Sequence, residues 1–133
     1  MLVFRIAHEK YANSLSVSGF AGRWNSAGKL VLYTTENVSL ALLENMMYRV
    51  GTGFNNEYKI MVIYYPNENL EQIITSDLPE KWRDTQSYSE LQEMGDLWYD
   101  EQKSLCLKVP SSIVPGNHNL IFNTTHPEFK NVK

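Results

Sequence analysis

Two arginines in this sequence lie where a guanidinium group could bind an anion. Arg5 falls in the middle of a short alternating segment, residues 2–7, so it either faces solvent from a sheet or enters a polar cleft. Arg23 falls in a Gly-Arg-Trp-Asn turn at residues 22–25, beside backbone amides. Because a guanidinium binds phosphate oxygens in pairs, this turn suits a diphosphate, and an incidental turn arginine is the alternative.

A glutamate and a serine are the other candidates for chemistry. Glu44 lies in a helical segment that is apolar over most of its circumference. A carboxylate there either borders the buried face or is directed into an internal site. Ser111 starts a turn after Pro110, where a serine is ordinarily structural. No Gly-x-Ser-x-Gly motif surrounds it, so we do not expect a hydrolase nucleophile.

Hydrophobic alternation predicts the strands that must position these side chains. They are expected at residues 2–7, 30–34, 59–65, 72–75, 105–109 and 119–122. Tyr33 lies at the end of the second of them. The polar, glycine-bearing residues 8–29 are predicted to form a long loop, which is unusual in a small domain unless it is functional.

Two helices are predicted from their end signals. The first covers residues 37–50, and the residues that mark its ends are Asn37 as N-cap, Arg49 in the last turn and Gly51 as C-cap. The second starts from a capping box at residues 87–90, extends to about Lys103 and is broken near Gly95. Because strands and helices follow one another without a regular βαβ alternation, the predicted class is α+β.

Length and composition favour one globular domain spanning residues 1–133. The chain has 133 residues, 43% of them hydrophobic, and a net charge of −3. No run of Lys or Arg stands out, so we expect neither direct nucleic-acid binding nor attraction to an anionic membrane. No apolar stretch approaches the ~18 residues that a membrane helix needs, and no signal peptide precedes the first strand.

Cysteine and histidine usage bears on metal and location. Cys106 is the only cysteine, so no internal disulfide can form, which favours a cytoplasmic protein. The three histidines, His8, His118 and His126, are scattered along the sequence. Because a structural zinc needs several closely spaced ligands, no metal site is expected.

The order and spacing of several motifs together resemble the RES domain family, which is named for its Arg, Glu and Ser. The matching segments run nearly from end to end: Phe4-Arg5-Ile6, Gly22-Arg23-Trp24-Asn25 with Gly28, Leu32-Tyr33-Thr34, Ala41-Leu42-Leu43-Glu44, Gly95-Asp96 with Trp98, Leu107 through Pro115, and Asn119 through Asn123 ahead of His126-Pro127. Two positions depart from the family pattern. Ala21 stands where the turn often has a second glycine, and Thr124 stands where a proline usually follows the asparagine.

The resemblance assigns family roles to individual residues. The residues expected to act in catalysis are Arg5, Glu44 and Ser111, with Ser112 as the next choice because the two serines adjoin. The residues expected to contact NAD are Arg5, Arg23, Tyr33, Glu44, Ser111, Asn119 and Asn123. The implied fold is similar to the ADP-ribosyltransferases: a twisted, split mixed sheet with flanking helices around an NAD cleft.

The resemblance also implies an activity and a partner. RES proteins are toxins of bacterial toxin–antitoxin pairs that deplete NAD by hydrolysis or phosphorolysis, and some modify a protein. NAD would be the substrate, with no further cofactor. The expected partner is an Xre-type antitoxin with a helix-turn-helix domain. A homodimer of this chain within a hetero-oligomeric complex with the antitoxin is one possible arrangement. A protein ADP-ribosyltransferase and a non-catalytic nucleotide- or partner-binding module remain the alternatives.

The roles follow from the chemistry of breaking the nicotinamide–ribose bond. Positive charge builds on the ribose as the neutral base leaves, and a nearby carboxylate stabilises it, which is the role expected for Glu44. Arg5 and Arg23 would bind the diphosphate or the adjacent ribose. Tyr33 would stack on nicotinamide, and Ser111 would either hydrogen-bond the nicotinamide end or orient a catalytic partner.

Overall fold

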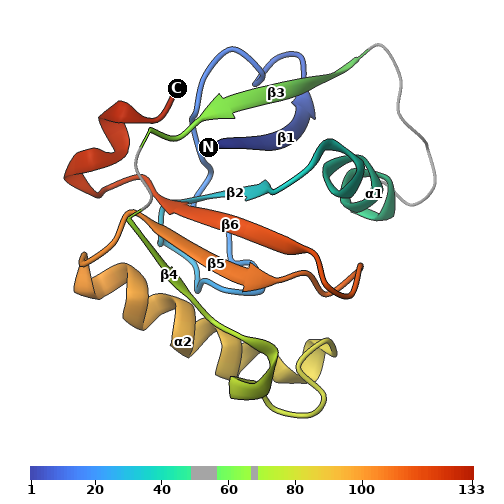
Figure 1. The fold of residues 1–133 in the computed structure, drawn as a ribbon, viewed down its shortest axis with the longest axis vertical. Helices are drawn as coiled ribbons and strands as arrows, with labels where there is room; N and C mark the ends of the chain where they lie inside the picture. Colours follow the sequence, from blue (N-terminus) through green and yellow to red (C-terminus); the bar gives the residue numbers. More distant parts are fainter. Residues whose placement is uncertain (49–56, 67–68) are drawn as a thin grey trace.

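The structure, a computed structural model, describes residues 1–48, 57–66 and 69–133. In chain order its elements are β1 (Leu2–His8), β2 (Val31–Thr35), α1 (Val38–Tyr48), β3 (Tyr58–Tyr64), β4 (Leu70–Gln72), α2 (Tyr88–Glu101), β5 (Cys106–Pro110) and β6 (His118–Asn123). Short 3-10 turns lie at Thr75–Asp77, Thr85–Ser87 and Pro127–Asn131. The predicted α+β class is confirmed (Figure 1).

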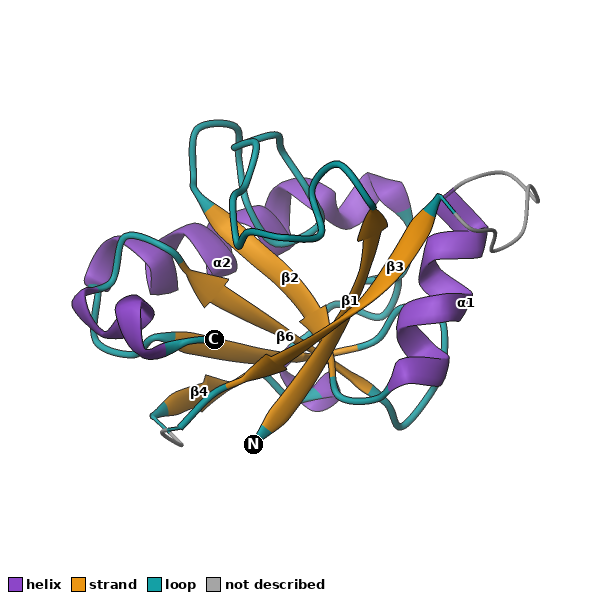
Figure 2. Ribbon diagram, turned by 90° about the horizontal axis from the view of Figure 1, so that it is seen from above, coloured by secondary structure: helices purple, strands orange, loops and turns teal. Residues whose placement is uncertain are grey.

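In the described part of the chain, six strands form one mixed sheet in the order β3-β1-β2-β6-β5-β4. Among these described strands, only the β4–β5 pair is parallel. β1 pairs with β3 along its whole length, and β2 pairs with β6 along its whole length. In contrast, β1 and β2 meet at a single pair, Phe4 opposite Thr35, and diverge from there (Figure 2). The sheet is therefore split between its first two strands, as the resemblance implies.

The sheet packs against a separate hydrophobic cluster on each of its two faces. In β6 the alternation of side chains places Leu120 and Phe122 in one cluster and Ile121 in the other. The first cluster includes Val3 and Ile63 from the β1–β3 ribbon. The second is built around three tryptophans and is covered by α2, which lies along one face of the sheet (Figure 1). The residues that line the cleft are thus carried on a rigid support.

The start of α1 is capped as predicted. The side chain of Asn37 accepts a hydrogen bond from the backbone N–H of Leu40 over 2.7 Å. The predicted last-turn Arg49 and C-cap Gly51 lie outside the described residues. The helix packs against β1 and β2, next to the point where those two strands part. This position places Glu44 in the cavity that Arg5 of β1 and Tyr33 of β2 also line.

The predicted interruption of the second helix near Gly95 is wrong, because α2 is continuous from Tyr88 to Glu101. Gly95 instead allows a close approach: a Cβ there would overlap the backbone carbonyl of Trp24. The predicted capping box is also wrong. The Ser87 side chain makes no cap bond and donates to the carbonyl of Lys81 over 2.8 Å.

The predicted short strand at 72–75 is displaced. The strand observed there is β4, Leu70–Gln72, which lies alongside β5 in parallel. Residues 73 and 74 lie outside the strand, and a 3-10 turn starts at Thr75.

None of the helices in the described ranges is long and apolar enough to cross a membrane.

Candidate functional site

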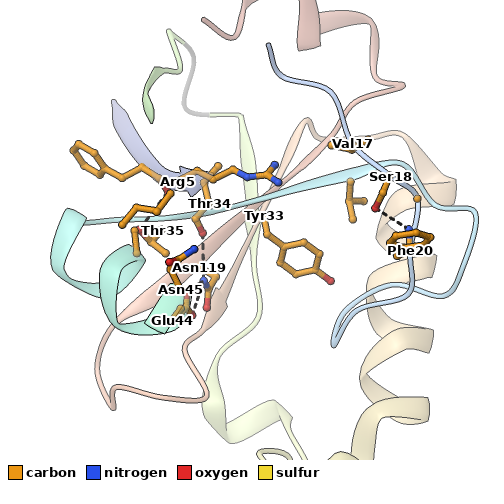
Figure 3. Close-up of a pocket in the computed structure, with 15 residues that line it drawn as sticks. Arg5, Val17, Ser18, Phe20, Tyr33, Thr34, Thr35, Glu44, Asn45 and Asn119 are labelled. Carbon is orange, nitrogen blue, oxygen red and sulfur yellow. Dashed lines mark hydrogen bonds between the residues drawn. The ribbon is translucent and has the colours of Figure 1, made fainter. Parts of the chain in front are cut away.

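Two adjoining cavities form a cleft, and the smaller of them lies where β1 and β2 diverge. Their volumes are about 240 Å³ and 430 Å³. Four side chains line both of them: Phe20, Tyr33, Glu44 and Asn119. The smaller cavity also contains Arg5, and the larger one contains Arg23, Tyr88 and Ser112. Most of the predicted site residues therefore meet in one cleft (Figure 3).

A hydrogen-bonded clamp holds the carboxylate of Glu44 at the junction of the two cavities. The side-chain amide of Asn119 donates to both Glu44 oxygens, each at 3.0 Å, and also approaches the carbonyl of Thr34 at 3.3 Å. The two residues come from α1 and from the start of β6, far apart in sequence. A carboxylate held through both oxygens has little rotational freedom, so its direction in the cleft is set before any ligand arrives.

Burial dominates the electrostatics of Glu44. Loss of water around the carboxylate raises its pKa, while the Asn119 hydrogen bond and the positive charge of Arg23 act in the opposite direction. The net result is a pKa above the ordinary value for a glutamate. A buried carboxylate in a low-dielectric cleft interacts more strongly with a developing positive charge than one in water does.

Arg5 projects its guanidinium toward the centre of the cleft (Figure 3). Burial lowers its pKa. Within residues 1–48, 57–66 and 69–133, no hydrogen bond or ion pair engages this guanidinium. A partly buried cation without an acceptor is costly, and an anionic ligand in the cleft would remove that cost.

Arg23 is a second cation, fixed by its surroundings. Its Nη1 atom donates to the backbone carbonyls of Trp82 (3.0 Å) and Arg83 (3.1 Å). The guanidinium also lies over the ring of Tyr88, 4.7 Å from the ring centroid. These contacts hold the positive charge on the wall of the larger cavity, where it reaches the carboxylate of Glu44 electrostatically.

Tyr33 links β2 to the Gly-Arg-Trp-Asn turn. Its hydroxyl donates to the side chain of Asn25 (2.6 Å) and accepts from the backbone N–H of Trp24 (3.1 Å). Gly22 is required here, because a Cβ would lie 2.8 Å from the Tyr33 oxygen. The hydroxyl is thus engaged in the protein, and the ring remains as a flat wall shared by both cavities.

The structure separates the two adjacent serines. Ser111 is 1% exposed, and its hydroxyl accepts hydrogen bonds from the backbone N–H groups of Ile113 and Val114, both at 3.1 Å. Ser112 is the serine that lines the larger cavity. The turn geometry therefore directs the predicted first choice into the protein and the second choice into the cleft.

Asn123 does not reach either cavity. It is fully buried at the opposite end of β6 from Asn119. Its side chain donates to the carbonyl of Tyr99 (3.1 Å) and accepts from the backbone N–H of Thr125 (2.9 Å). These bonds stabilise the turn after β6, which is a structural role in this part of the chain.

Among the residues the structure describes, no group of three His, Cys, Asp or Glu side chains is close enough to hold a metal ion. Several residues that line the cleft were not singled out from the sequence, among them Tyr88, Asn45 and Phe20. Phe20 is the most exposed of these three. It carries no charge and belongs to no motif, and its only signal is an aromatic side chain just ahead of the Gly-Arg-Trp-Asn turn.

The described strands and helices form a split, mixed α+β sheet with flanking helices around the cleft, as predicted. The chain belongs to the RES domain family, whose sequence profile matches residues 2–133. It is 29% identical over 134 residues to "Toxin Res" of Yersinia enterocolitica, which spans 98% of this chain and 88% of that protein. It is 31% identical over 128 residues to the "Prs ADP-ribosylating toxin" of Sphingobium sp., spanning 92% of this chain and 80% of that protein.

A solved structure shares the fold. The M. tuberculosis MbcT–MbcA toxin–antitoxin complex contains a chain that matches with a TM-score of 0.73. The match covers 91% of this chain and 72% of that chain at 16% sequence identity. At this identity the likeness establishes the arrangement of strands and helices, and the site must be argued from its own residues.

Proposed function

We propose that this chain is the toxin of a toxin–antitoxin pair and that it breaks the bond between nicotinamide and ribose in NAD. The names of its relatives support this: two are toxins, one of them ADP-ribosylating, and the matched structure is a toxin–antitoxin complex. The observation that carries the proposal is the pairing of a clamped, partly buried carboxylate with a partly buried arginine that lacks an acceptor in the described chain.

Glu44 is assigned to the reacting end of the substrate. As the neutral nicotinamide leaves, the ribose becomes oxocarbenium-like, and a carboxylate already aimed by Asn119 stabilises that charge without having to reorient. Ionisation of the carboxylate is required for this role. The Asn119 bond and the Arg23 charge both favour the ionised form against the effect of burial.

The arginines are assigned to the diphosphate. Arg5 has its donors free of acceptors among the described residues, and Arg23 retains donors beyond the one that binds backbone carbonyls. Holding the diphosphate fixes the glycosidic bond against Glu44, which is how binding energy remote from the bond contributes to rate. Tyr33 supplies the flat face for nicotinamide, and Ser112 is the hydroxyl within reach of the cleft.

The group that takes the ADP-ribose decides the product. Water or phosphate would give free ADP-ribose or its phosphorolysis product, and this is the main proposal. A protein acceptor is the second candidate, and the name of the Sphingobium relative favours it. NAD is the only small molecule that either reaction needs besides the acceptor, and the proposed location is the cytoplasm.

The test is nicotinamide release by the purified protein and by Glu44→Gln. The amide keeps the shape of the side chain and removes the charge, so turnover should fall roughly 100- to 1,000-fold while NAD still binds. Glu93→Gln is the matched control, because Glu93 is exposed on α2 and outside both cavities. Thermal unfolding of the same samples checks that each variant is folded.

The products of this assay separate the candidate functions. Free nicotinamide with soluble ADP-ribose or its phosphate ester supports the main proposal, and radiolabel on a protein supports the transferase. Intact NAD after incubation with wild-type protein would leave a non-catalytic binding module. A folded Glu44→Gln protein with wild-type turnover would contradict the role of Glu44.

A further inference from the structure

Phe20 is a large apolar side chain at the cleft to which the proposed function assigns no task. It is 82% exposed, although it lines both cavities. Burying such a ring elsewhere would stabilise the fold by a few kcal/mol, so its exposure brings no benefit to folding. An exposed aromatic at the mouth of a ligand cleft is a surface that a flat apolar group can cover.

The backbone that presents Phe20 is held in place on both sides. Gly19 has a left-handed φ of 77°, which favours glycine, and its carbonyl accepts from Gly28 N–H over 2.9 Å. The carbonyl of Phe20 itself accepts from the side chain of Asn25 over 3.0 Å, and Asn25 is 1% exposed. The ring is therefore displayed by a fixed support, and little backbone entropy would be lost on covering it.

The position of Phe20 matches the order of groups in NAD. In Figure 3 it lies across the cleft from Glu44, and the guanidinium of Arg5 projects into the space between them. NAD has the same order: a ribose carrying nicotinamide, a diphosphate, and a second ribose carrying adenine. If the carboxylate faces the first ribose and the guanidinium faces the diphosphate, the adenine reaches the side of the cleft where Phe20 stands.

We propose that Phe20 is the platform on which the adenine base of the substrate stacks. The identity of the ligand rests on the proposed function, and the platform itself rests on the exposure, support and position of the ring. Stacking on a single aromatic face contributes to affinity and leaves the reacting bond untouched. Phe20 is thus assigned to recognition of the distal end of the substrate, apart from bond breaking at Glu44.

The experiment measures binding of two fragments of NAD by calorimetry. ADP-ribose contains the adenine, and nicotinamide mononucleotide lacks it. Phe20→Ala should weaken ADP-ribose binding roughly tenfold and leave nicotinamide mononucleotide binding unchanged, and Phe20→Trp should restore it. In turnover, the KM for NAD should rise in Phe20→Ala while kcat stays within about twofold of wild type.

Tyr11→Ala is the matched control. Tyr11 is 63% exposed in the same loop and lines neither of the two cavities, so its removal should leave both titrations unchanged. Wild-type affinity for ADP-ribose in a folded Phe20→Ala protein would overturn the proposal. An equal loss of affinity for ADP-ribose and for nicotinamide mononucleotide would overturn it as well. Absence of nicotinamide release by the wild-type protein would count against the proposed function alone, because the two titrations do not depend on turnover.

Discussion

The carboxylate of Glu44 is subject to opposing influences from its neighbours. Burial favours the protonated form, whereas the two hydrogen bonds from Asn119 favour the ionised form that the proposed chemistry requires. Asn119 was predicted to contact NAD directly. Its amide is directed at Glu44 and Thr34, so the structure supports a positioning role for it beside any contact with substrate.

Removal of the clamp should change the pH dependence of turnover. Glu44 must be ionised to act, so activity is lost as the pH falls through its pKa, and that midpoint lies above the ordinary range for a glutamate. Asn119→Leu removes a bond that lowers this pKa, so the acid limb of kcat should move to higher pH. The measurement is nicotinamide release over a pH series.

Asn13→Leu serves as the control for this series, because Asn13 is exposed in a loop away from the cleft. Its acid limb should coincide with that of the wild type. An unchanged acid limb in a folded Asn119→Leu protein would show that the clamp does not govern ionisation of Glu44. A loss of stability alone would lower the amount of active protein without moving the midpoint.

Most of the site residues predicted from the sequence line the cleft, but the exposure of individual side chains could not be predicted. Charge and motif position pointed to Arg5, Arg23 and Glu44, all of which line the cavities. The burial of Ser111 could not be predicted, because it depends on a turn in which two backbone N–H groups donate hydrogen bonds to the Ser111 hydroxyl. The exposure of Phe20 at the cleft depends on tertiary contacts, and a sequence pattern alone predicts that an aromatic residue is buried in the core.

Among the elements, α2 shows how packing overrides a local signal. A glycine inside a helical pattern usually weakens the helix, and this favoured a break at Gly95. The helix is continuous, and the glycine has another reason. The turn that carries Arg23 approaches α2 so closely that a side chain at position 95 has no room. Ser26 strengthens the same contact by donating to the side chain of Asp96.

Gly95→Ala should therefore destabilise the protein. Helix propensity alone predicts a gain of about 1 kcal/mol, whereas overlap with the Trp24 carbonyl should cost about 1–3 kcal/mol or more. We expect the unfolding temperature to fall by several degrees in calorimetry, with NAD turnover reduced because the turn is displaced. Glu93→Ala, at an exposed position of the same helix, should not lower it. A stabilised Gly95→Ala protein would refute the packing argument.

The strands were predictable from alternation, but the split between them was not. The alternation of residues in a strand predicts which of its side chains are buried. It does not predict over what length the strand pairs with its neighbour. β1 pairs with β3 and β2 pairs with β6 along their full length, whereas β1 and β2 meet each other at a single pair. Such pairings join segments far apart in the chain, beyond the reach of a local pattern.

At the scale of the whole molecule, the cleft opens at the surface, where a partner can cover it. We predict that a neighbouring helix-turn-helix antitoxin binds this chain tightly and closes the cleft. Co-expression of the two proteins should restore growth, give a stable complex and abolish nicotinamide release, because a covered cleft admits no NAD. Growth arrest that persists with both proteins folded and abundant would count against this prediction.

The order of the strands along the chain determines when the site can form during synthesis. β6 is synthesised after every other strand of the sheet, yet it provides the neighbour that β2 needs along its length and the amide that holds Glu44. A growing polypeptide that lacks β6 contains Arg5, Arg23 and Glu44, but neither the strand that pairs with β2 nor the amide that holds Glu44. The site therefore forms only after β6 has been synthesised, so an antitoxin that is already present meets the toxin as its cleft is completed.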